Sequence, residues 1–329
     1  MIRILITGGC GFAGHHLVEH MLKNTDWHVT VLDRLNYASS GFDRLRDIEA
    51  FDVSRVRVLT ADFTNPIVDG LAKEIGDVDY IVHMGAETHV DNSISNPEPF
   101  VMANVVGTMR LLDYARTLPN LKQFLYFSTD EVFGPAPEGV AYKEWDRYNS
   151  GNPYAAAKAG GEELVLAYAN TFKIPCVITH TMNIFGERQH PEKFIPKIIN
   201  KVMQGETMTI HSNAAKTKAG SRFYIHGRNV AAAVLFLLGL PHEKTDKFNI
   251  VGEKEVDNLQ LAQAVAGILG KELLYEMVDF HSSRPGHDLR YALDGSKMRE
   301  LGWEPPRDFA SSLEKTVKWY VDNPKWLLT

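Results

Sequence analysis

Short apolar runs alternate with longer stretches of helical periodicity over the first half of the chain. Nearly continuous apolar runs are typical of parallel strands that are covered on both faces. Strand, helix and strand in this order and at this spacing predict a doubly wound α/β sheet with right-handed crossovers. The expected strands are residues 2–7, 28–33, 56–62, 80–85, 123–129 and 176–183, and the expected helices are residues 12–23, 67–75, 99–118 and 153–172.

The pattern changes after residue 183, where loops lengthen and proline and charged residues become more frequent. Helices are expected at residues 192–204 and 259–269, and an apolar helix at 230–238 should pack back on the first domain. We therefore expect a smaller second domain that is interleaved with the first. The expected division is residues 1–183 plus about 222–252 for the first domain, and about 184–221 plus 253–329 for the second.

Composition and charge exclude several classes of protein. Of the 329 residues, 44% are hydrophobic and 23% are charged, which is ordinary for a globular enzyme, and the formal net charge is −6. Such a chain lacks the basic field that bulk binding to nucleic acid or to an anionic membrane would need. An anionic ligand must therefore find its positive charge locally.

No targeting, membrane or metal signal stands out in the sequence. The chain starts at Met1 with an apolar strand that runs directly into glycines, so no signal peptide is expected. The longest other apolar stretch, residues 230–240, is too short to cross a bilayer. Cys10 and Cys176 cannot form a disulfide framework, and the 13 histidines show no metal-binding spacing. A cytoplasmic protein without a metal is expected.

A glycine-rich loop, Thr-Gly-Gly-Cys-Gly-Phe-Ala-Gly over residues 7–14, follows the first expected strand and opens the first expected helix. Glycine allows a tight turn and a close approach of the backbone to a pyrophosphate, and the N–H groups of the helix N-terminus attract the phosphates. This order of elements predicts a dinucleotide site. The residues expected to contact the cofactor here are Gly8, Gly11, Phe12, Ala13 and Gly14.

Asp33 ends the second expected strand, 19 residues after Gly14, where its carboxylate can accept both ribose hydroxyls of an adenosine. Its charge would repel a 2′-phosphate, which favours NAD over NADP, although Arg34 beside it leaves NADP open. Asp62, at the end of the third expected strand, is expected near the adenine edge of the cofactor. The alternative is that Asp62 only caps its strand.

Tyr154 and Lys158 lie four residues apart in an expected helix, so both side chains face the same side, within reach of a shared ligand. Both are expected to contact the cofactor. A nearby ammonium stabilises phenolate and should lower the pKa of Tyr154 towards neutrality. Tyr154 would then be a usable general base for a proton of a sugar hydroxyl.

The segment Ser-Thr-Asp-Glu-Val-Phe-Gly, residues 128–134, begins at the end of the fifth expected strand. With the glycine loop, Asp33 and the Tyr154/Lys158 pair, it resembles the extended short-chain dehydrogenases/reductases, and among them the nucleotide-sugar 4,6-dehydratases. The resemblance covers nearly the whole chain and implies an NAD-binding Rossmann fold with a C-terminal substrate domain. Further stretches that agree are residues 33–38, 86–91, 191–196 and 284–291.

The chemistry explains why a dehydratase needs two more carboxyl groups than an epimerase. It must also remove a C5 proton and protonate the departing C6 hydroxyl, which takes one carboxylate and one carboxylic acid. The resemblance implies Glu131 as the C5 base, Asp130 as the C6 acid and Thr129 as a hydrogen-bond partner of the C4 oxygen. It also implies that Tyr154 takes the C4 hydroxyl proton while NAD accepts the hydride and later returns it.

The resemblance also implies a site for a nucleotide-diphosphate sugar. The expected substrate-binding residues are Glu87, Asn183, Glu192, Lys193, Arg222, Asn258, His287 and Tyr291. The chain departs from the family pattern at residues 183–189 and 211–224, so the nucleotide base and the sugar C2 substituent stay open. Lys216 and Lys218 are expected to close over the diphosphate, with a solvated loop as the alternative.

The leading interpretation is a lyase, an NAD-dependent nucleotide-sugar 4,6-dehydratase with a substrate of the dTDP-glucose or UDP-glucose type. The alternatives are a UDP-sugar epimerase, a UDP-glucuronate decarboxylase, or a non-enzymatic protein that senses NAD. Asp130 argues against the first two, because neither reaction needs an acid at C6. The expected helices 99–118 and 153–172 carry apolar residues on more than one face, which predicts a homodimer with an isologous interface.

Overall fold

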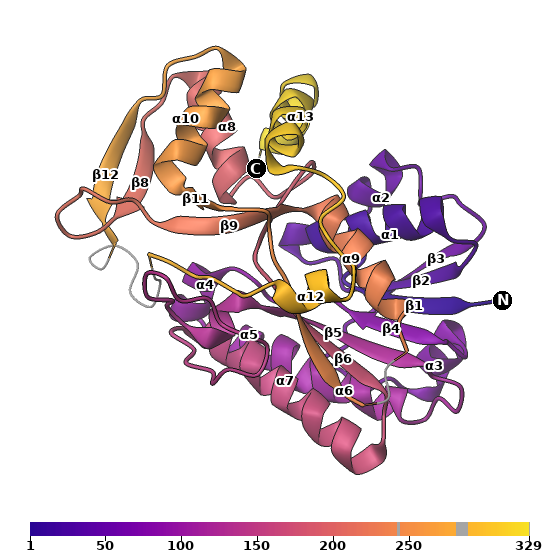
Figure 1. Cartoon of the computed structure of the whole chain (residues 1–329). Coiled ribbons are helices and arrows are strands. Elements are labelled where there is room, and N and C mark those ends of the chain that lie inside the picture. The colour runs from indigo at the N-terminus through magenta and orange to yellow at the C-terminus, as the bar shows by residue number, and fades with distance from the viewer. Residues whose placement is uncertain (242–243, 281–288, 329) are drawn as a thin grey trace.

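A seven-stranded parallel sheet forms the centre of the computed structural model, which describes residues 1–241, 244–280 and 289–328 (Figure 1). Every neighbouring pair of strands in this sheet runs parallel. The doubly wound α/β fold is therefore confirmed. In spatial order the strands are β10 (Asp246–Ile250), β6 (Cys176–Thr181), β5 (Gln123–Thr129), β4 (Tyr80–His83), β1 (Arg3–Thr7), β2 (His28–Asp33) and β3 (Val56–Thr60).

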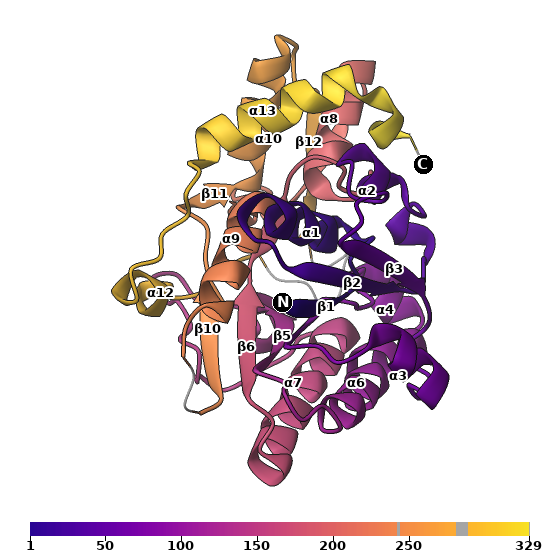
Figure 2. The ribbon, with the colours of Figure 1, turned by 90° about the vertical axis from the view of Figure 1, so that its right-hand side faces the viewer.

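Helices cover both faces of this sheet, because alternate residues of each buried strand point to opposite sides. Ile4 and Ile6 face one core, and Leu5 faces the other. Figure 2 shows the two layers of helices. The first layer is α1 (Phe12–Asn24), α2 (Asp43–Asp47), α9 (Gly227–Leu238) and α12 (Ser296–Glu300), and the second is α3 (Asp69–Ile75), α6 (Gly107–Ala115) and α7 (Pro153–Phe172).

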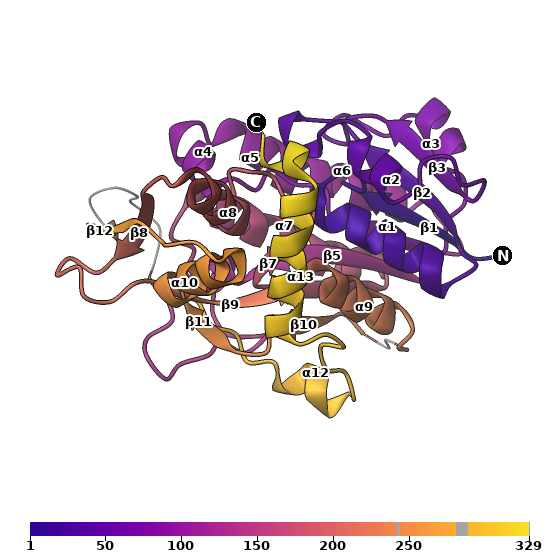
Figure 3. The same cartoon turned by 90° about the horizontal axis from the view of Figure 1, so that it is seen from above.

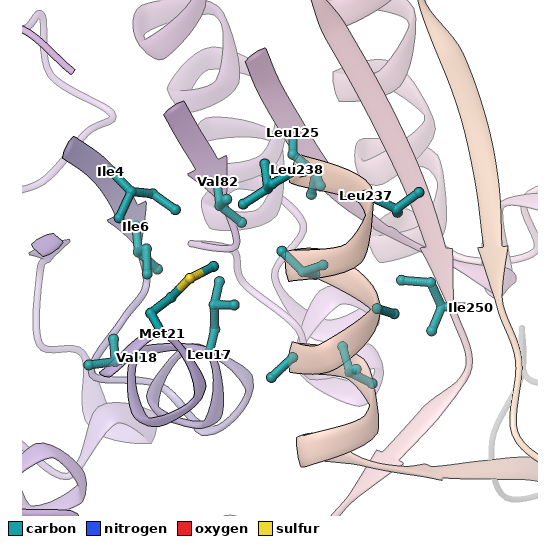
Figure 4. Close-up of a cluster of buried hydrophobic side chains, with 14 of the residues drawn as sticks. Ile4, Ile6, Leu17, Val18, Met21, Val82, Leu125, Leu237, Leu238 and Ile250 are labelled. Atoms are coloured by element: carbon teal, nitrogen blue, oxygen red, sulfur yellow. The ribbon is translucent and has the colours of Figure 1, made fainter. Parts of the chain in front are cut away.

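Helix α9 packs beside α1 on the sheet, as the sequence predicts (Figure 4). Leu237 and Leu17 are fully buried in this core. Met298 of α12 and Trp303 belong to the same core, although they lie in the segment expected in the second domain. The expected division of the chain into two domains stays a prediction.

A second, smaller region carries its own core and two short sheets (Figure 3). One sheet has the order β11 (Glu255–Asp257), β9 (Ser221–His226), β7 (Asn183–Phe185), and the other pairs β12 (Tyr275–Asp279) with β8 (Met208–Ser212). The helices α8 (Phe194–Gln204), α10 (Asn258–Leu269) and α13 (Phe309–Asp322) pack on this core. Further elements of the described residues are α4 (Val90–Ser95), α5 (Glu98–Val101), and the 3-10 turns Tyr37–Ser39, Asp130–Phe133 and Pro324–Leu327.

The helix expected at residues 99–118 is interrupted by a π-helical turn, Met102–Val106, between α5 and α6. Within this turn the side chain of Asn104 accepts a hydrogen bond from the Glu87 N–H and donates one to the Glu87 carbonyl, both at 3.1 Å. The Asn104 carbonyl accepts a hydrogen bond from Thr108 Oγ1 at 2.7 Å. The two bonds to Glu87 tie the widened turn to a remote segment, which periodicity alone does not reveal.

The strand expected at residues 176–183 also differs, because β6 ends at Thr181 and Asn183 already begins β7 in another sheet.

Across the described ranges, no helix is long and apolar enough to cross a membrane, and no group of histidine, cysteine or acidic residues is placed to hold a metal ion. The expected cytoplasmic location stays a prediction.

Replacing Leu237 with alanine tests the contact between α9 and the sheet. Leu237 is fully buried, so we expect Leu237→Ala to lower the free energy of unfolding by about 2–5 kcal/mol, measured by urea denaturation. The control is Leu274→Ala, since Leu274 is 43% exposed. If Leu237→Ala and Leu274→Ala lost the same free energy of unfolding, the assignment of Leu237 to the core would be contradicted.

Candidate active site

One large cavity opens at the carboxyl ends of the sheet strands, where the order of strands reverses around β1. Its volume is about 1090 Å³, and its walls come from both the sheet and the smaller region. Ligands of doubly wound folds bind at this kind of position. Of the predicted site residues, the wall includes Gly8, Gly11, Phe12, Ala13, Gly14, Asp33, Glu87, Thr129, Asp130, Glu131, Tyr154, Lys158, Asn183, Glu192, Lys193, Arg222, Asn258 and Tyr291.

Two predicted site residues are not part of this wall as described. His287 lies outside the described residues. Asp62 does not line the described cavity, and its carboxylate accepts a hydrogen bond from Thr64 N at 2.9 Å and lies 3.4 Å from Arg34 Nη1. These contacts match the strand-end cap that the sequence left as the alternative.

The glycine loop brings backbone close to backbone at the start of α1. Gly8 has a φ of +72°, and a Cβ atom on it would lie 2.7 Å from the Cα of Gly85. A Cβ on Gly14 would lie 2.7 Å from the Cα of Gly9. Gly11, the N-cap of α1, provides no side-chain cap, so the first turn presents N–H groups beside the cavity.

Asp33 is fixed beside this loop at the end of β2. Its Oδ2 accepts a hydrogen bond from Cys10 N at 3.0 Å, and its Oδ1 accepts one from Leu35 N at 2.9 Å. Arg34 forms ion pairs with Glu87 and Asp62, so its charge is already engaged by carboxylates. This arrangement weakens the case for a 2′-phosphate and agrees with NAD.

Glu87 lines the cavity, and its side chain contacts Arg34 and Asn36, which follow Asp33 in the chain. Besides the pair with Arg34, Glu87 Oε1 accepts a hydrogen bond from Asn36 Nδ2 at 3.1 Å. The predicted contact of Glu87 with the substrate therefore stays a prediction.

Asp130 is a buried carboxyl group at the end of β5, between Thr129 and Glu131. Thr129 Oγ1 donates to Asp130 Oδ1 at 3.1 Å, and no residue in the described part of the chain pairs with Asp130 Oδ2. Burial, and then the charge of Glu131, raise the pKa of Asp130 to about 7, while Arg222 acts in the opposite direction. Asp130 can therefore hold a proton near neutral pH.

Asn152 joins Glu131 to the start of α7. Its Nδ2 donates to Glu131 Oε2 at 2.9 Å, and its Oδ1 caps α7 by accepting a hydrogen bond from Ala155 N at 2.9 Å. The helix that carries Tyr154 and Lys158 is thus tied directly to the carboxylate expected to act as base.

The predicted lowering of the Tyr154 pKa by Lys158 is wrong for the chain itself. Burial, and then the charges of Glu131 and Asp130, raise the pKa of Tyr154. Burial also lowers the pKa of Lys158 to about 7, and its Nζ donates to the Phe127 carbonyl at 2.6 Å. The spacing of the two residues identifies a shared face, but desolvation decides the direction of the shift.

Arg222 is held in the cavity wall by backbone carbonyl groups. Its Nη1 donates to the carbonyl oxygens of Ser221 and Leu289, both at 2.7 Å, and its guanidinium lies 4.6 Å from the ring centre of Tyr291. Nearby, Asn258 Oδ1 accepts a hydrogen bond from Tyr224 at 2.8 Å. A fixed guanidinium suits a diphosphate group.

Glu192 lies between two histidines in the cavity wall. Its carboxylate oxygens are 3.7 Å from His89 Nε2 and 3.6 Å from His190 Nδ1, and the second of these oxygens is 3.9 Å from Lys193 Nζ. Sequence reasoning missed both histidines as cavity residues. It also missed Tyr37, Lys197, Asn200, Lys201, Thr209 and His211, which line the cavity as well.

The sequence does carry a pattern that could have identified the lysines at the start of α8 and within it as one face of the helix. Lys193, Lys197 and Lys201 recur every four residues, and the opposite face carries the buried Ile195 and Ile198. This pattern predicts a cationic face, but the sequence does not show that the face borders a cavity.

The basic segment before Arg222 forms a compact turn. Asn213 Oδ1 accepts hydrogen bonds from Thr217 N at 2.8 Å and Lys218 N at 3.1 Å. Lys218 Nζ lies 3.3 Å from Glu138 Oε2, and neither Lys216 nor Lys218 is part of the cavity wall as described. Their expected closure over a diphosphate has no support in this arrangement.

Comparison with known proteins identifies the family. Residues 4–251 match the model of the NAD dependent epimerase/dehydratase family. The chain belongs to this family. The Low-salt glycan biosynthesis protein Agl12 of Haloferax volcanii is 38% identical to this chain over 319 residues, which are 97% of this chain and 98% of that protein.

Two solved structures show the same fold with ligands. The structure of DesIV (dTDP-glucose 4,6-dehydratase) from Streptomyces venezuelae, with NAD and TYD bound, has a TM-score of 0.88 at 34% identity and covers 99% of each chain. UDP-glucuronic acid 4-epimerase from Bacillus cereus, in complex with UDP-glucuronic acid and NAD, has a TM-score of 0.87 at 25% identity, covering 98% of this chain and 100% of that one. The protein is therefore an NAD-dependent enzyme that modifies nucleotide sugars, and the predicted family and cofactor are confirmed.

The pKa of Asp130 makes a prediction about stability. Because its pKa rises from about 3.9 in an unfolded chain to about 7 in the folded one, folding favours the protonated form, and this contribution is lost as pH rises from 4 through 7. Between pH 5 and pH 8, wild type should lose about 1–3 kcal/mol more stability than Asp130→Asn, measured by urea denaturation at one NAD concentration. Asp322→Asn, at an exposed position, should behave as wild type. Parallel curves for wild type and Asp130→Asn would contradict the buried, protonated carboxyl.

Proposed function

We propose that this protein is a nucleotide-sugar 4,6-dehydratase, a lyase that converts an NDP-hexose to the NDP-4-keto-6-deoxyhexose. The observation that carries this proposal is the pair of carboxyl groups at the end of β5. Asp130 is buried with a pKa of about 7, and Glu131 accepts a hydrogen bond from Asn152. One acid and one base on the same cavity wall are what removal of water across C5 and C6 requires.

The proposed roles follow from this geometry. Glu131 takes the C5 proton, and Asp130 gives its proton to the departing C6 hydroxyl. Tyr154 takes the proton of the C4 hydroxyl, and Thr129, whose Oγ1 already contacts Asp130, binds the C4 oxygen. NAD supplies a reversible hydride acceptor and, in its oxidised form, the positive charge that a buried tyrosine needs to lose its proton. The cofactor contacts proposed for the chain are those of the glycine loop, Asp33 and Lys158.

We propose a nucleotide-diphosphate hexose of the dTDP-glucose or UDP-glucose type as the substrate. Arg222 supplies a fixed guanidinium for the diphosphate, and Lys193 adds a second positive charge to the cavity wall. Because the net charge of the chain is −6, an anionic ligand needs positive charge close to its binding site, and these two residues supply it.

A C4 epimerase is the second candidate, since a UDP-glucuronic acid 4-epimerase shares the fold. Epimerases and decarboxylases of UDP-sugars need no acid at C6, and an NAD-sensing protein needs no catalytic set at all, so none of these accounts for Asp130. Incubation with a panel of nucleotide sugars separates the candidates, because 4-keto products develop absorbance in alkali. Epimerised sugars without such absorbance would overturn the proposal.

The proton transfers can be separated by two variants. Glu131→Gln should nearly abolish exchange of the C5 hydrogen with deuterated solvent, while substrate still reduces bound NAD, since Tyr154 is intact. Tyr154→Phe should suppress the reduction itself. Losses of about 10²–10⁴ in rate are expected for a missing general acid or base. Turnover of Glu131→Gln near the wild-type rate would show that the roles are assigned wrongly.

We also propose that two copies of the chain pair through the face formed by α5, the π-helical turn and α7. Val101, Met102 and Phe172 are 46%, 40% and 45% exposed, and these helices lie against one another. Light scattering should give about twice the chain mass of 36.9 kDa. Val101→Glu should give the monomer mass, whereas Leu274→Glu, at an exposed apolar residue elsewhere, should not. A monomeric wild type at micromolar concentration would refute the pairing.

A further inference from the structure

Glu162 of α7 is a charged carboxylate that lies entirely inside the protein, behind the active-site cavity. Its side chain is 0% exposed. Glu162 Oε1 accepts a hydrogen bond from Ser128, and Oε2 accepts one from Tyr148 and lies 3.1 Å from His180 Nε2 and 3.5 Å from Lys247 Nζ. Four segments of the chain, including β5, β6 and β10, therefore meet α7 at this one carboxylate.

The ionised form of this group is stabilised by its partners. Burial alone would raise the pKa of Glu162, but His180, Lys247 and the hydrogen bond from Ser128 together hold it at about 2. His180 Nδ1 in turn lies 2.9 Å from Asn249 Oδ1, so the histidine ring is held at both nitrogens. The cluster is a complete polar network, and such networks fix one arrangement of the elements that they join.

The position of Glu162 connects the two halves of the proposed catalytic set. Tyr154, Lys158 and Glu162 follow one another at intervals of four residues, so they share one side of α7. Ser128, which donates to Glu162, lies on β5 directly before Thr129, the last residue of the strand, and Asp130 and Glu131 follow in the 3-10 turn. The carboxylate therefore joins the helix that carries the tyrosine and lysine to the strand that leads directly into the proposed acid and base.

We propose that Glu162 is a positioning residue for the reaction: it fixes α7 against the end of β5, and its negative charge helps to keep Lys158 protonated. The effect of Glu162 on turnover rests on the proposed function, whereas its effect on Lys158 does not. Stability alone is a weak reason for such a cluster, because well-packed apolar residues in place of a buried ion pair often leave a protein equally stable.

The electrostatic part concerns Lys158. Burial lowers the pKa of Lys158 to about 7, and the charge of Glu162 opposes that change. Among the described residues, the neighbours of the ammonium are neutral: the Phe127 carbonyl at 2.6 Å, the ring of Tyr126 at 4.1 Å, Tyr154 on the same helix, and His83, whose pKa is held well below its usual value by burial and by Lys158 itself. Without Glu162, Lys158 should lose its proton at a lower pH.

The test compares Glu162→Gln, which keeps the shape and removes the charge, with Glu162→Asp, which keeps the charge and shortens the side chain. The control is Glu163→Gln, because Glu163 is exposed on the same helix. In NAD-loaded protein, NMR of ¹³C-labelled lysine should show the pKa of Lys158 about one pH unit lower in Glu162→Gln and near wild type in Glu162→Asp and Glu163→Gln.

The kinetic readout is turnover of a nucleotide sugar over a range of pH. Glu162→Gln should lower kcat by about 10–100-fold with little change in KM, and should move the alkaline limb of the profile to lower pH. Glu162→Asp should lower kcat without moving that limb. An unchanged Lys158 pKa together with wild-type kcat in Glu162→Gln would overturn the proposal.

Two further measurements keep the proposal testable. If Glu162→Gln does not fold, Tyr148→Phe removes one hydrogen bond to the carboxylate, and Glu162→Gln with Lys247→Gln removes one charge of each sign; the Lys158 pKa should still be lower than in wild type, by less than in Glu162→Gln, because loss of the Lys247 charge acts in the opposite direction. If wild type converts no nucleotide sugar, the proposed function fails, whereas the NMR titration still decides whether Glu162 controls Lys158.

Discussion

Close packing of backbone at glycines is the constraint on which the arrangement of the molecule depends. A Cβ atom on Gly14 would overlap the carbonyl group of Gly8, so only glycine lets α1 start directly against the loop after β1. A Cβ on Gly227, at the start of α9, would overlap the ring of His16 on α1. These contacts set both helices side by side on one face of the sheet and leave the cavity open at the strand ends.

Two buried carboxyl groups at the junction of β5 and α7 differ in charge because their partners differ. Asp130 has a nearby carboxylate and little compensation, so burial raises its pKa. Glu162 has a histidine, a lysine and hydroxyl donors, which together outweigh burial and lower its pKa. Desolvation acts in the same direction on both groups, and the neighbouring charges decide the outcome. One junction thus provides a neutral acid beside the cavity and a fixed negative charge behind it.

Structural features that depend only on residues close together in the sequence could be predicted from the sequence. The strands β2 and β5 and the helix α7 have the predicted bounds, because unbroken apolar runs and helical periodicity are local properties. The glycine loop and the shared face of Tyr154 and Lys158 follow from spacing, and they line the cavity together. The family pattern in residues 128–134 indicated the proposed acid and base, Asp130 and Glu131, which spacing alone does not identify.

The sequence by itself therefore determined the parallel sheet, the dinucleotide loop and the face of α7 that carries Tyr154 and Lys158. Only the tertiary structure decided the π-helical turn at Asn104, the pKa of Tyr154 and the part that α8 takes in the cavity wall. The physical reason is distance along the chain. Each of these features depends on burial or on a partner contributed by a remote segment, and neither is encoded in the spacing of nearby residues.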